Sequence, residues 1–241
     1  MIPFRNSSTG RMVEHSISLA DQIYEKIKNG IIRGEIKPGH RLFEVEVAKN
    51  FDASRTPVRE AFRRLEQDSL AERVAQGGIR VIQLDEQTVK DLFNLRTFLE
   101  AHAIELACDR ITAEEITILK QIKAQATELL KSTDIDRDFA LNLLFELNSA
   151  FHDTIYNSTR SRFLIKLLIN IRAVILSMRT ISIRLDSVRQ VWDEHSEIIR
   201  QLERRDKKRA VRLVNEHISK TAAQILAYVR SQSHDAGAPP G

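Results

Sequence analysis

Apolar residues recur with helical spacing along most of this chain. In the first such segment every fourth residue is leucine or isoleucine, and Ser18, a residue type that caps helices, stands just before it. The apolar stripe consists of Leu19, Ile23, Ile27 and Ile31. This pattern predicts an amphipathic helix from Ser18 to Arg33, and Gly34 is a typical residue to end it.

A second and a third helix are predicted to meet at a tight angle. The second is short and follows a turn at Pro38-Gly39 and the segment 41–43. Its apolar residues are Val45, Val47, Ala48 and Phe51. A break at Asp52 separates it from the third helix, which Ser54 caps and which ends near Asp68. Two helices joined in this way are typical of a helix-turn-helix unit.

Two short strands are predicted after the third helix. They cover residues 70–74 and 79–84, and a glycine turn at Gln76-Gly77-Gly78 joins them. Three helices followed by such a hairpin form a winged domain, which we assign to residues 18–85. Because Gly77 and Gly78 carry no bulky side chain, the backbone at this tip can approach a phosphate or a minor groove closely.

The rest of the chain reads as an all-helical bundle over residues 86–232, because it contains almost no glycine or proline. One helix carries Leu92, Leu95, Leu99, Ala103 and Leu106, and Thr112 with Glu115 offers a capping box for the next. Further helices are predicted over residues 135–156, 162–181, 187–202 and 207–230. We expect residues 1–17 to form a flexible arm and 233–241 a disordered tail. The predicted fold class is therefore mainly α.

Composition agrees with a two-domain protein of the cytoplasm. At 241 residues the chain exceeds one average domain, and its hydrophobic content of 42% suffices for buried cores. The single Cys108 excludes an internal disulfide framework and is expected to be a buried, inert thiol. No apolar run reaches membrane-spanning length, and the N-terminus lacks the apolar core of a secretory signal. A net charge of +4 permits nucleic-acid binding without arguing strongly for it.

The start of the third predicted helix carries the candidate DNA contacts. Arg55 and Arg59 stand four residues apart and leave one face of the helix, and the planar fork of arginine matches the paired acceptors of guanine. Ser54 and Thr56 are further candidates, Thr56 for a phosphate or a thymine methyl group. An ordinary helix start with two solvated arginines explains the same fragment. The flanking segments must therefore distinguish between the two interpretations.

A second candidate site lies in the bundle. Asn148 and His152 are four residues apart on one helix, so they share a face and can chelate one ion. His195 and His217 lie on the last two helices, and the three histidines converge only if these helices pack around a common centre. A histidine in an ordinary hydrogen-bonded role is the alternative. That reading is assigned to the remaining four, His15, His40, His102 and His234.

Taken together, these motifs resemble the GntR family of bacterial transcription regulators. The resemblance rests on Pro38-Gly39, the segment 46–51, the run Ser-Arg-Thr-Pro-Val-Arg-Glu-Ala at 54–61, and the wing. Two departures stand out, since many relatives carry a DNA-contacting arginine where this chain has Val45 and a basic residue at the wing tip. Both suggest fewer direct contacts, so Arg55, Arg59 and Arg41 would carry more of the binding.

The bundle resembles the FCD ligand-binding domain of the FadR-type regulators in this family. The resemblance implies that Asn148, His152, His195 and His217 hold a divalent metal ion, zinc or nickel, at the floor of a cavity for a small carboxylate effector. Many members have aspartate in place of Asn148. Because an amide adds no negative charge, affinity for the ion should fall. The ion would also keep its full positive charge, so an anionic effector should gain more binding energy from coordinating it. The candidates to pair with that effector are Arg96, Arg172 and Arg179.

The predicted function is that of a DNA-binding regulator and not of an enzyme. We expect a repressor, because repression relieved by an effector is the commoner behaviour in the family that this chain resembles. A homodimer on a palindromic double-stranded operator, without a membrane partner, is expected. Candidates for the dimer interface are Leu164, Leu167, Leu168 and Ile171. Two alternatives stay open. One is a regulator without metal, and the other is a metal-dependent hydrolase in which Glu194 or Glu216 serves as general base.

Overall fold

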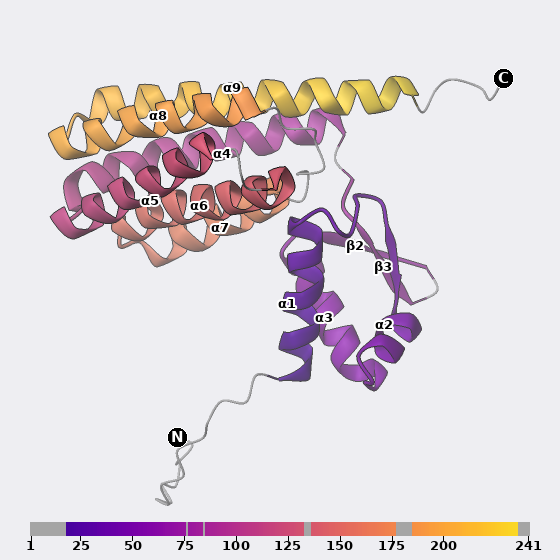
Figure 1. The fold of residues 1–241 in the computed structure, drawn as a ribbon. Coiled ribbons are helices and arrows are strands. Elements are labelled where there is room, and N and C mark those ends of the chain that lie inside the picture. The colour runs from indigo at the N-terminus through magenta and orange to yellow at the C-terminus, as the bar shows by residue number, and fades with distance from the viewer. Residues whose placement is uncertain (1–17, 76, 84, 133–135, 177–184, 236–241) are drawn as a thin grey trace, which may run out of the picture.

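The computed structural model describes residues 18–75, 77–83, 85–132, 136–176 and 185–235 of the chain. These residues form nine helices and one three-stranded sheet, arranged as a winged domain beside a bundle of long helices (Figure 1). The mainly α fold class is thus confirmed. Within the same residues no helix is both long and apolar enough to cross a bilayer.

The first helix of the winged domain follows the predicted pattern closely. Helix α1 (Leu19–Ile32) begins with a capping box, in which the Ser18 hydroxyl accepts from the Asp21 N–H and the Asp21 carboxylate accepts from the Ser18 N–H. Ile23, Ile27 and Ile31 are buried, whereas Leu19 at the exposed start of the stripe keeps 39% of its surface. The helix therefore buries one face against the rest of the domain.

Helices α2 (Glu44–Asn50) and α3 (Arg55–Gln67) form the helix-turn-helix unit. Asp52 adopts a positive φ of 47° between them, and the Ala53 N–H donates to the Ala48 carbonyl at 2.9 Å, which makes the turn tight. Ser54 occupies the N-cap position, as predicted, but its side chain makes no capping hydrogen bond. Its exposed hydroxyl is thus not engaged in capping.

The wing contains one strand more than the two predicted. Strands β1 (Arg41–Phe43), β2 (Ala71–Val74) and β3 (Gly78–Val81) form an antiparallel sheet in the order β1-β3-β2. Leu42 lies opposite Ile79 and Phe43 opposite Gly78. The predicted hairpin is present, with its second strand ending at Val81. Strand β1 was not predicted because three residues are too short to reveal an alternating pattern.

The bundle consists of α4 (Glu86–Arg110), α5 (Ala113–Lys131), α6 (Arg137–Ser158), α7 (Arg162–Leu176), α8 (Leu185–Arg204) and α9 (Lys207–Asp235). Thr112 and Glu115 form the predicted capping box at the start of α5. Helix α4 packs along α9, and α5 packs against α6 and α8 (Figure 1). Helix α9 extends into the segment predicted to be a tail, while the arm 1–17 and residues 236–241 lie outside the described residues.

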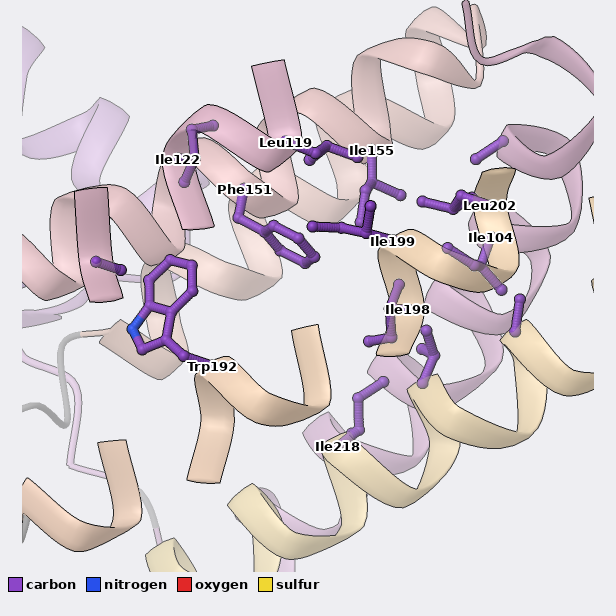
Figure 2. Packing of buried hydrophobic residues seen from close by; sticks show 14 of the residues in the cluster. Ile104, Leu119, Ile122, Phe151, Ile155, Trp192, Ile198, Ile199, Leu202 and Ile218 are labelled. Atoms are coloured by element: carbon purple, nitrogen blue, oxygen red, sulfur yellow. The ribbon is translucent and has the colours of Figure 1, made fainter. Parts of the chain in front are cut away.

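The centre of the bundle is an apolar core shared by several helices. Figure 2 shows Phe151 and Trp192 near each other, and their ring centroids are 6.3 Å apart. The core continues with Ile198, Ile199 and Leu202 of α8. Cys108 is fully buried in the same core, and burial raises the pKa of its thiol to about 11. This agrees with the inert thiol that was predicted.

Helix α7 contacts both parts of the molecule. Leu164 and Leu168 pack with Ala103 of α4 and Tyr156 of α6, so these two proposed dimer contacts are buried inside the chain, whereas Leu167 is 52% exposed. Near the end of the helix, Ala173 and Val174 belong to the apolar cluster of the winged domain. The winged domain is therefore seated on the bundle through α7.

Gly78 is required by the pairing of β1 with β3, because a Cβ atom at this position would lie 2.5 Å from the Leu42 carbonyl oxygen. We expect Gly78→Ala to lower the free energy of unfolding of the winged domain by about 1–3 kcal/mol through this overpacking. Thermal unfolding followed by circular dichroism checks this. The matched change Glu72→Ala, which removes only a half-exposed ion pair with Arg80, should cost less than about 1 kcal/mol. Equal midpoints for the two variants would contradict the expectation.

Candidate DNA-reading face and metal centre

The first turns of α3 divide cleanly into an inner and an outer face. Val58, Ala61, Phe62 and Leu65 are buried in the domain core. The predicted contacts Ser54, Arg55, Thr56 and Arg59 are all exposed on the opposite side. Because the buried face fixes the rotation of the helix, the sequence places all four candidates where a DNA duplex can reach them.

Both arginines share one carboxylate that the sequence analysis did not identify. Glu44 Oε2 accepts from Arg55 Nε at 3.1 Å, from Arg55 Nη2 at 2.8 Å and from Arg59 Nε at 2.9 Å. The Glu44 side chain is 4% exposed, whereas those of Arg55 and Arg59 are 51% and 58% exposed. Burial acts to raise the pKa of Glu44, but the two guanidiniums outweigh it and hold the pKa below its ordinary value. The carboxylate is therefore ionised at neutral pH.

The wing tip is joined to the same residue. Gly77 has a φ of 79°, and its carbonyl accepts from the Glu44 N–H at 3.1 Å. Gly78 is buried within β3, and Arg41 is exposed on β1. Gln76 lies outside the described residues. The contacts of Arg41, Gly77 and Gly78 with DNA stay predictions.

The three predicted histidines come together in the bundle. His152 of α6, His195 of α8 and His217 of α9 are all buried, and one nitrogen from each lies within 4.8 Å of the others. His195 is stacked on Phe151, with ring centroids 3.9 Å apart, and meets the edge of Trp192 at 4.9 Å. The apolar core thus holds the imidazoles in a common centre.

Several of these nitrogens have no hydrogen-bond partner among the described residues. They are His152 Nε2 and both ring nitrogens of His195. Burial lowers the pKa values of His152 and His195 well below the ordinary range, and neighbouring positive groups add to this. Both rings are therefore neutral at neutral pH. A neutral imidazole with an unpaired nitrogen is the form that binds a metal ion.

His217 is oriented by a carboxylate. Its Nδ1 lies 2.7 Å from Glu194 Oε2, and Glu194 Oε1 accepts from Lys220 Nζ at 2.6 Å. Burial acts to raise the pKa of Glu194, but the bonds from His217 and Lys220 prevail and lower it. Since an ionised carboxylate can only accept, Nδ1 donates to it, and Nε2 is the ring nitrogen that remains for another partner. Such a contact between a carboxylate and the second ring nitrogen is typical of histidines that bind metal.

Asn148 lies at the wall of a cavity beside the histidines. The described residues outline a space of about 140 Å³, which Asn148, His152 and His217 line together. Apolar side chains such as Leu144, Phe145 and Trp192 form much of the remaining wall. His195 lies deeper, with no exposed surface. Asn148, His152 and His217 therefore border a small, mostly apolar chamber, and His195 lies next to the two histidines.

Two of the three candidate effector-binding arginines also line this chamber. Arg96 donates from Nε to Glu100 Oε1 at 2.6 Å, and Arg172 donates from Nη2 to Asp153 Oδ1 at 2.6 Å. Each guanidinium is thus already paired with a carboxylate of the protein. Arg179 lies outside the described residues.

The donor set fits a divalent ion. Imidazole nitrogens and an amide oxygen are ligand types that zinc and nickel accept, and a zinc–nitrogen bond measures about 2.0–2.1 Å. Without an ion, the unpaired nitrogens of His195 lower the stability of the fold, because they are buried among aromatic rings with no hydrogen-bond partner among the described residues. His152, His195 and His217 would hold the ion, and Asn148 lines the chamber that His152 and His217 also line.

The two carboxylates considered as general bases of a hydrolase are engaged elsewhere. Glu194 is occupied by His217 and Lys220. Glu216 is exposed on the outer side of α9 and lies 3.8 Å from Arg212. Neither is disposed to activate a water molecule in the chamber, which argues against the hydrolase alternative.

Sequence reasoning missed the acidic partners of these sites. Glu44, Glu100, Asp153 and Glu194 each contact a candidate arginine or histidine. Glu100 lies four residues after Arg96, a spacing that could have indicated the pair. The other partners are distant in sequence, and no local pattern marks them.

Comparison with known proteins identifies both parts of the chain. The family described as bacterial regulatory proteins, gntR family, matches residues 19–81, and the FCD domain family matches residues 91–220. The regulator YdhC of Bacillus subtilis is 29% identical over 199 residues, which cover 82% of this chain and 87% of that protein. The Nta operon transcriptional regulator of Aminobacter aminovorans is 31% identical over 194 residues, covering 80% and 88%.

Solved structures share the fold. McbR of Escherichia coli superposes with a TM-score of 0.71 at 20% identity over 90% of this chain and 99% of that chain. The metal-free FCD domain of TM0439 superposes with a TM-score of 0.51 at 21% identity over 62% and 99%. The chain therefore belongs to the GntR family of bacterial transcription regulators with a C-terminal FCD domain, a family of DNA-binding regulators and not of enzymes.

Proposed function

We propose that this regulator is a homodimeric repressor that binds a palindromic operator and releases it when a small carboxylate enters the FCD chamber. In this proposal Arg41, Ser54, Arg55, Thr56, Arg59, Gly77 and Gly78 contact DNA. A divalent ion, zinc or nickel, is held by Asn148, His152, His195 and His217. The observation that carries the proposal is the group of three buried histidines beside a small chamber with two arginines in its wall.

The charges of the chamber favour an anionic effector only when an ion is bound. Arg96 and Arg172 are each neutralised by a carboxylate, and Asn148 adds no charge. A bound divalent ion supplies positive charge and a Lewis acid at the end of the chamber. Arg172 can then reorient from Asp153 toward the effector, since its partner is 38% exposed and can be hydrated instead.

The size of the chamber supports a small effector. A volume of about 140 Å³ is well below the roughly 300–1,000 Å³ typical of pockets for drug-sized molecules. Its largely apolar wall leaves few polar partners beyond the imidazoles, Asn148, Arg96 and Arg172. An acid with a short carbon chain, its carboxylate directed toward the histidines, fits these limits.

Exposed apolar side chains support a dimer through the bundle. Leu95 and Phe98 of α4 are 49% and 72% exposed, and Phe163 and Leu167 of α7 are 73% and 52% exposed. The two helices pack against each other, so these side chains lie along neighbouring elements. Such exposure of large apolar groups is typical of an interface, and a second copy pairing its two winged domains fits a palindromic operator.

The names of relatives support repression. RspR of Escherichia coli, 26% identical over 215 residues, is named a transcriptional repressor, as is GlaR of the same organism. A solved relative named as the metal-free form of an FCD domain supports an ion in this domain.

The first test concerns DNA reading. Duplexes selected from a random library by the wild-type protein provide the probe, and a scrambled duplex of equal composition provides the reference. We expect Arg59→Gln to reduce the preference for the selected duplex by about 5- to 100-fold, since a guanine contact is lost. Arg63 is exposed on the same helix, and Arg63→Gln should lower the affinity for both duplexes by a similar factor. Unchanged preference in Arg59→Gln would refute the assigned reading face.

The second test concerns the metal. Protein purified without a histidine tag should contain about one zinc or nickel ion per chain by elemental analysis. His195→Ala should lose most of it because a buried ligand is removed, whereas His102→Ala, at an exposed position on α4, should keep it. Wild-type protein that stays free of metal after incubation with zinc and nickel salts would favour the metal-free alternative.

The third test concerns the effector. A panel of short mono- and dicarboxylic acids is screened for release of the selected duplex, and the active acid is measured by calorimetry. We expect Arg172→Met to weaken its binding by about ten- to hundredfold, because a charged hydrogen bond is lost, while the metal content stays unchanged. Arg162→Met, an exposed position on the same helix, serves as control. Equal affinities in both variants would remove Arg172 from the effector site.

A further inference from the structure

The buried carboxylate of Glu44 stands at the junction of three parts of the reading unit. It is the first residue of α2, and its N–H donates to the Gly77 carbonyl of the wing tip. Its carboxylate receives three hydrogen bonds from the exposed arginines of α3. One residue therefore connects helix α2, the recognition helix and the wing.

A carboxylate in this position requires its partners. Burial disfavours the charged form, and the hydrogen bonds and charges of the two guanidiniums offset that cost. Since all three bonds end on the same oxygen, Oε2, the two arginines are drawn to one point. Each side chain is thus held in a defined direction before any DNA arrives.

The bonds to Glu44 also decide which donors are left for bases. Arg55 turns its Nε and Nη2 edge toward the carboxylate, while Arg59 uses Nε alone. Each terminal nitrogen of a guanidinium carries two hydrogens, so in both arginines the edge formed by Nη1 and Nη2 keeps N–H groups that make none of these three bonds. That edge is a fork that matches the O6 and N7 acceptors of guanine, so both arginines keep donors for a two-point contact with a base while they are bonded to Glu44.

We propose that Glu44 is a positioning residue for DNA reading, which orients the guanidiniums of Arg55 and Arg59 and restrains their attraction to any phosphate backbone. This inference rests on the reading role proposed above for the two arginines. Orientation before binding favours the correct base sequence, because the conformational freedom of the long side chains is already lost. The negative charge beneath them weakens sequence-independent attraction to phosphates. Glu44 therefore increases discrimination more than affinity.

The test is Glu44→Gln, measured against the selected and the scrambled duplex at several salt concentrations. The proposal expects two opposite changes. Preference for the selected duplex falls on the order of tenfold, because the arginines lose their common acceptor. Affinity for the scrambled duplex stays equal or rises, and its salt dependence steepens by up to about one unit of slope, because a negative charge is gone.

Glu46→Gln is the matched control. Glu46 lies two residues further on α2 and is exposed, so the substitution changes the charge equally without touching the carboxylate that holds the arginines. If Glu44→Gln and Glu46→Gln keep the same preference while Arg59→Gln loses it, the role of Glu44 is wrong and the reading face stands. If Arg59→Gln also keeps it, the reading face itself is wrong, and the inference fails with it.

A measurement on the wild-type protein covers the case in which Glu44→Gln does not fold. Heteronuclear NMR resolves the Nε–H groups of arginine side chains. In free protein those of Arg55 and Arg59 should exchange with water more slowly than that of the exposed Arg63, because they are bonded to a buried acceptor. Equal exchange of all three would overturn the proposal.

Discussion

Buried polar groups have to be paired, and this constraint shapes both sites of the protein. Beneath the proposed reading face, Glu44 is ionised because two guanidiniums compensate its charge. In the bundle, Glu100 accepts from Arg96 and from the Tyr156 hydroxyl. Leaving such groups unpaired costs about 1–3 kcal/mol each, and more when they are charged. His195 departs from this rule, since neither ring nitrogen has a partner among the described residues. A bound metal ion would be a partner for one of these ring nitrogens.

Features that depend on neighbours in sequence were predictable. The stripe of isoleucines in α1, the capping boxes at Ser18 and Thr112, and the tight turn before α3 all follow from local spacing. The boundaries of α6 and α9 shifted by a few residues, which is ordinary for frayed ends. Strand β1 escaped notice because its pairing with β3 joins residues 41–43 to residues 78–80, and three residues carry no period.

The sites were only partly predictable for the same reason. Asn148 and His152 share a helix face by spacing alone, but the meeting of His195 and His217 with them depends on how α8 and α9 pack against α6. That arrangement came from the family resemblance and not from periodicity. Glu44 precedes Arg55 and Arg59 by eleven and fifteen positions, and no sequence pattern indicates that a carboxylate so placed would turn inward. Leu164 and Leu168 were offered to a partner copy although the chain itself covers them.

Adjacent residues of helix α7 contact the chamber and the winged domain. Arg172 lines the chamber, and the next two residues, Ala173 and Val174, are part of the apolar cluster beneath the winged domain. Its partner Asp153 also borders a groove lined by Asn29 and Arg33 of the winged domain. A small rotation of α7 would therefore change the wall of the chamber and the contact with the winged domain together, without the movement of any intervening element.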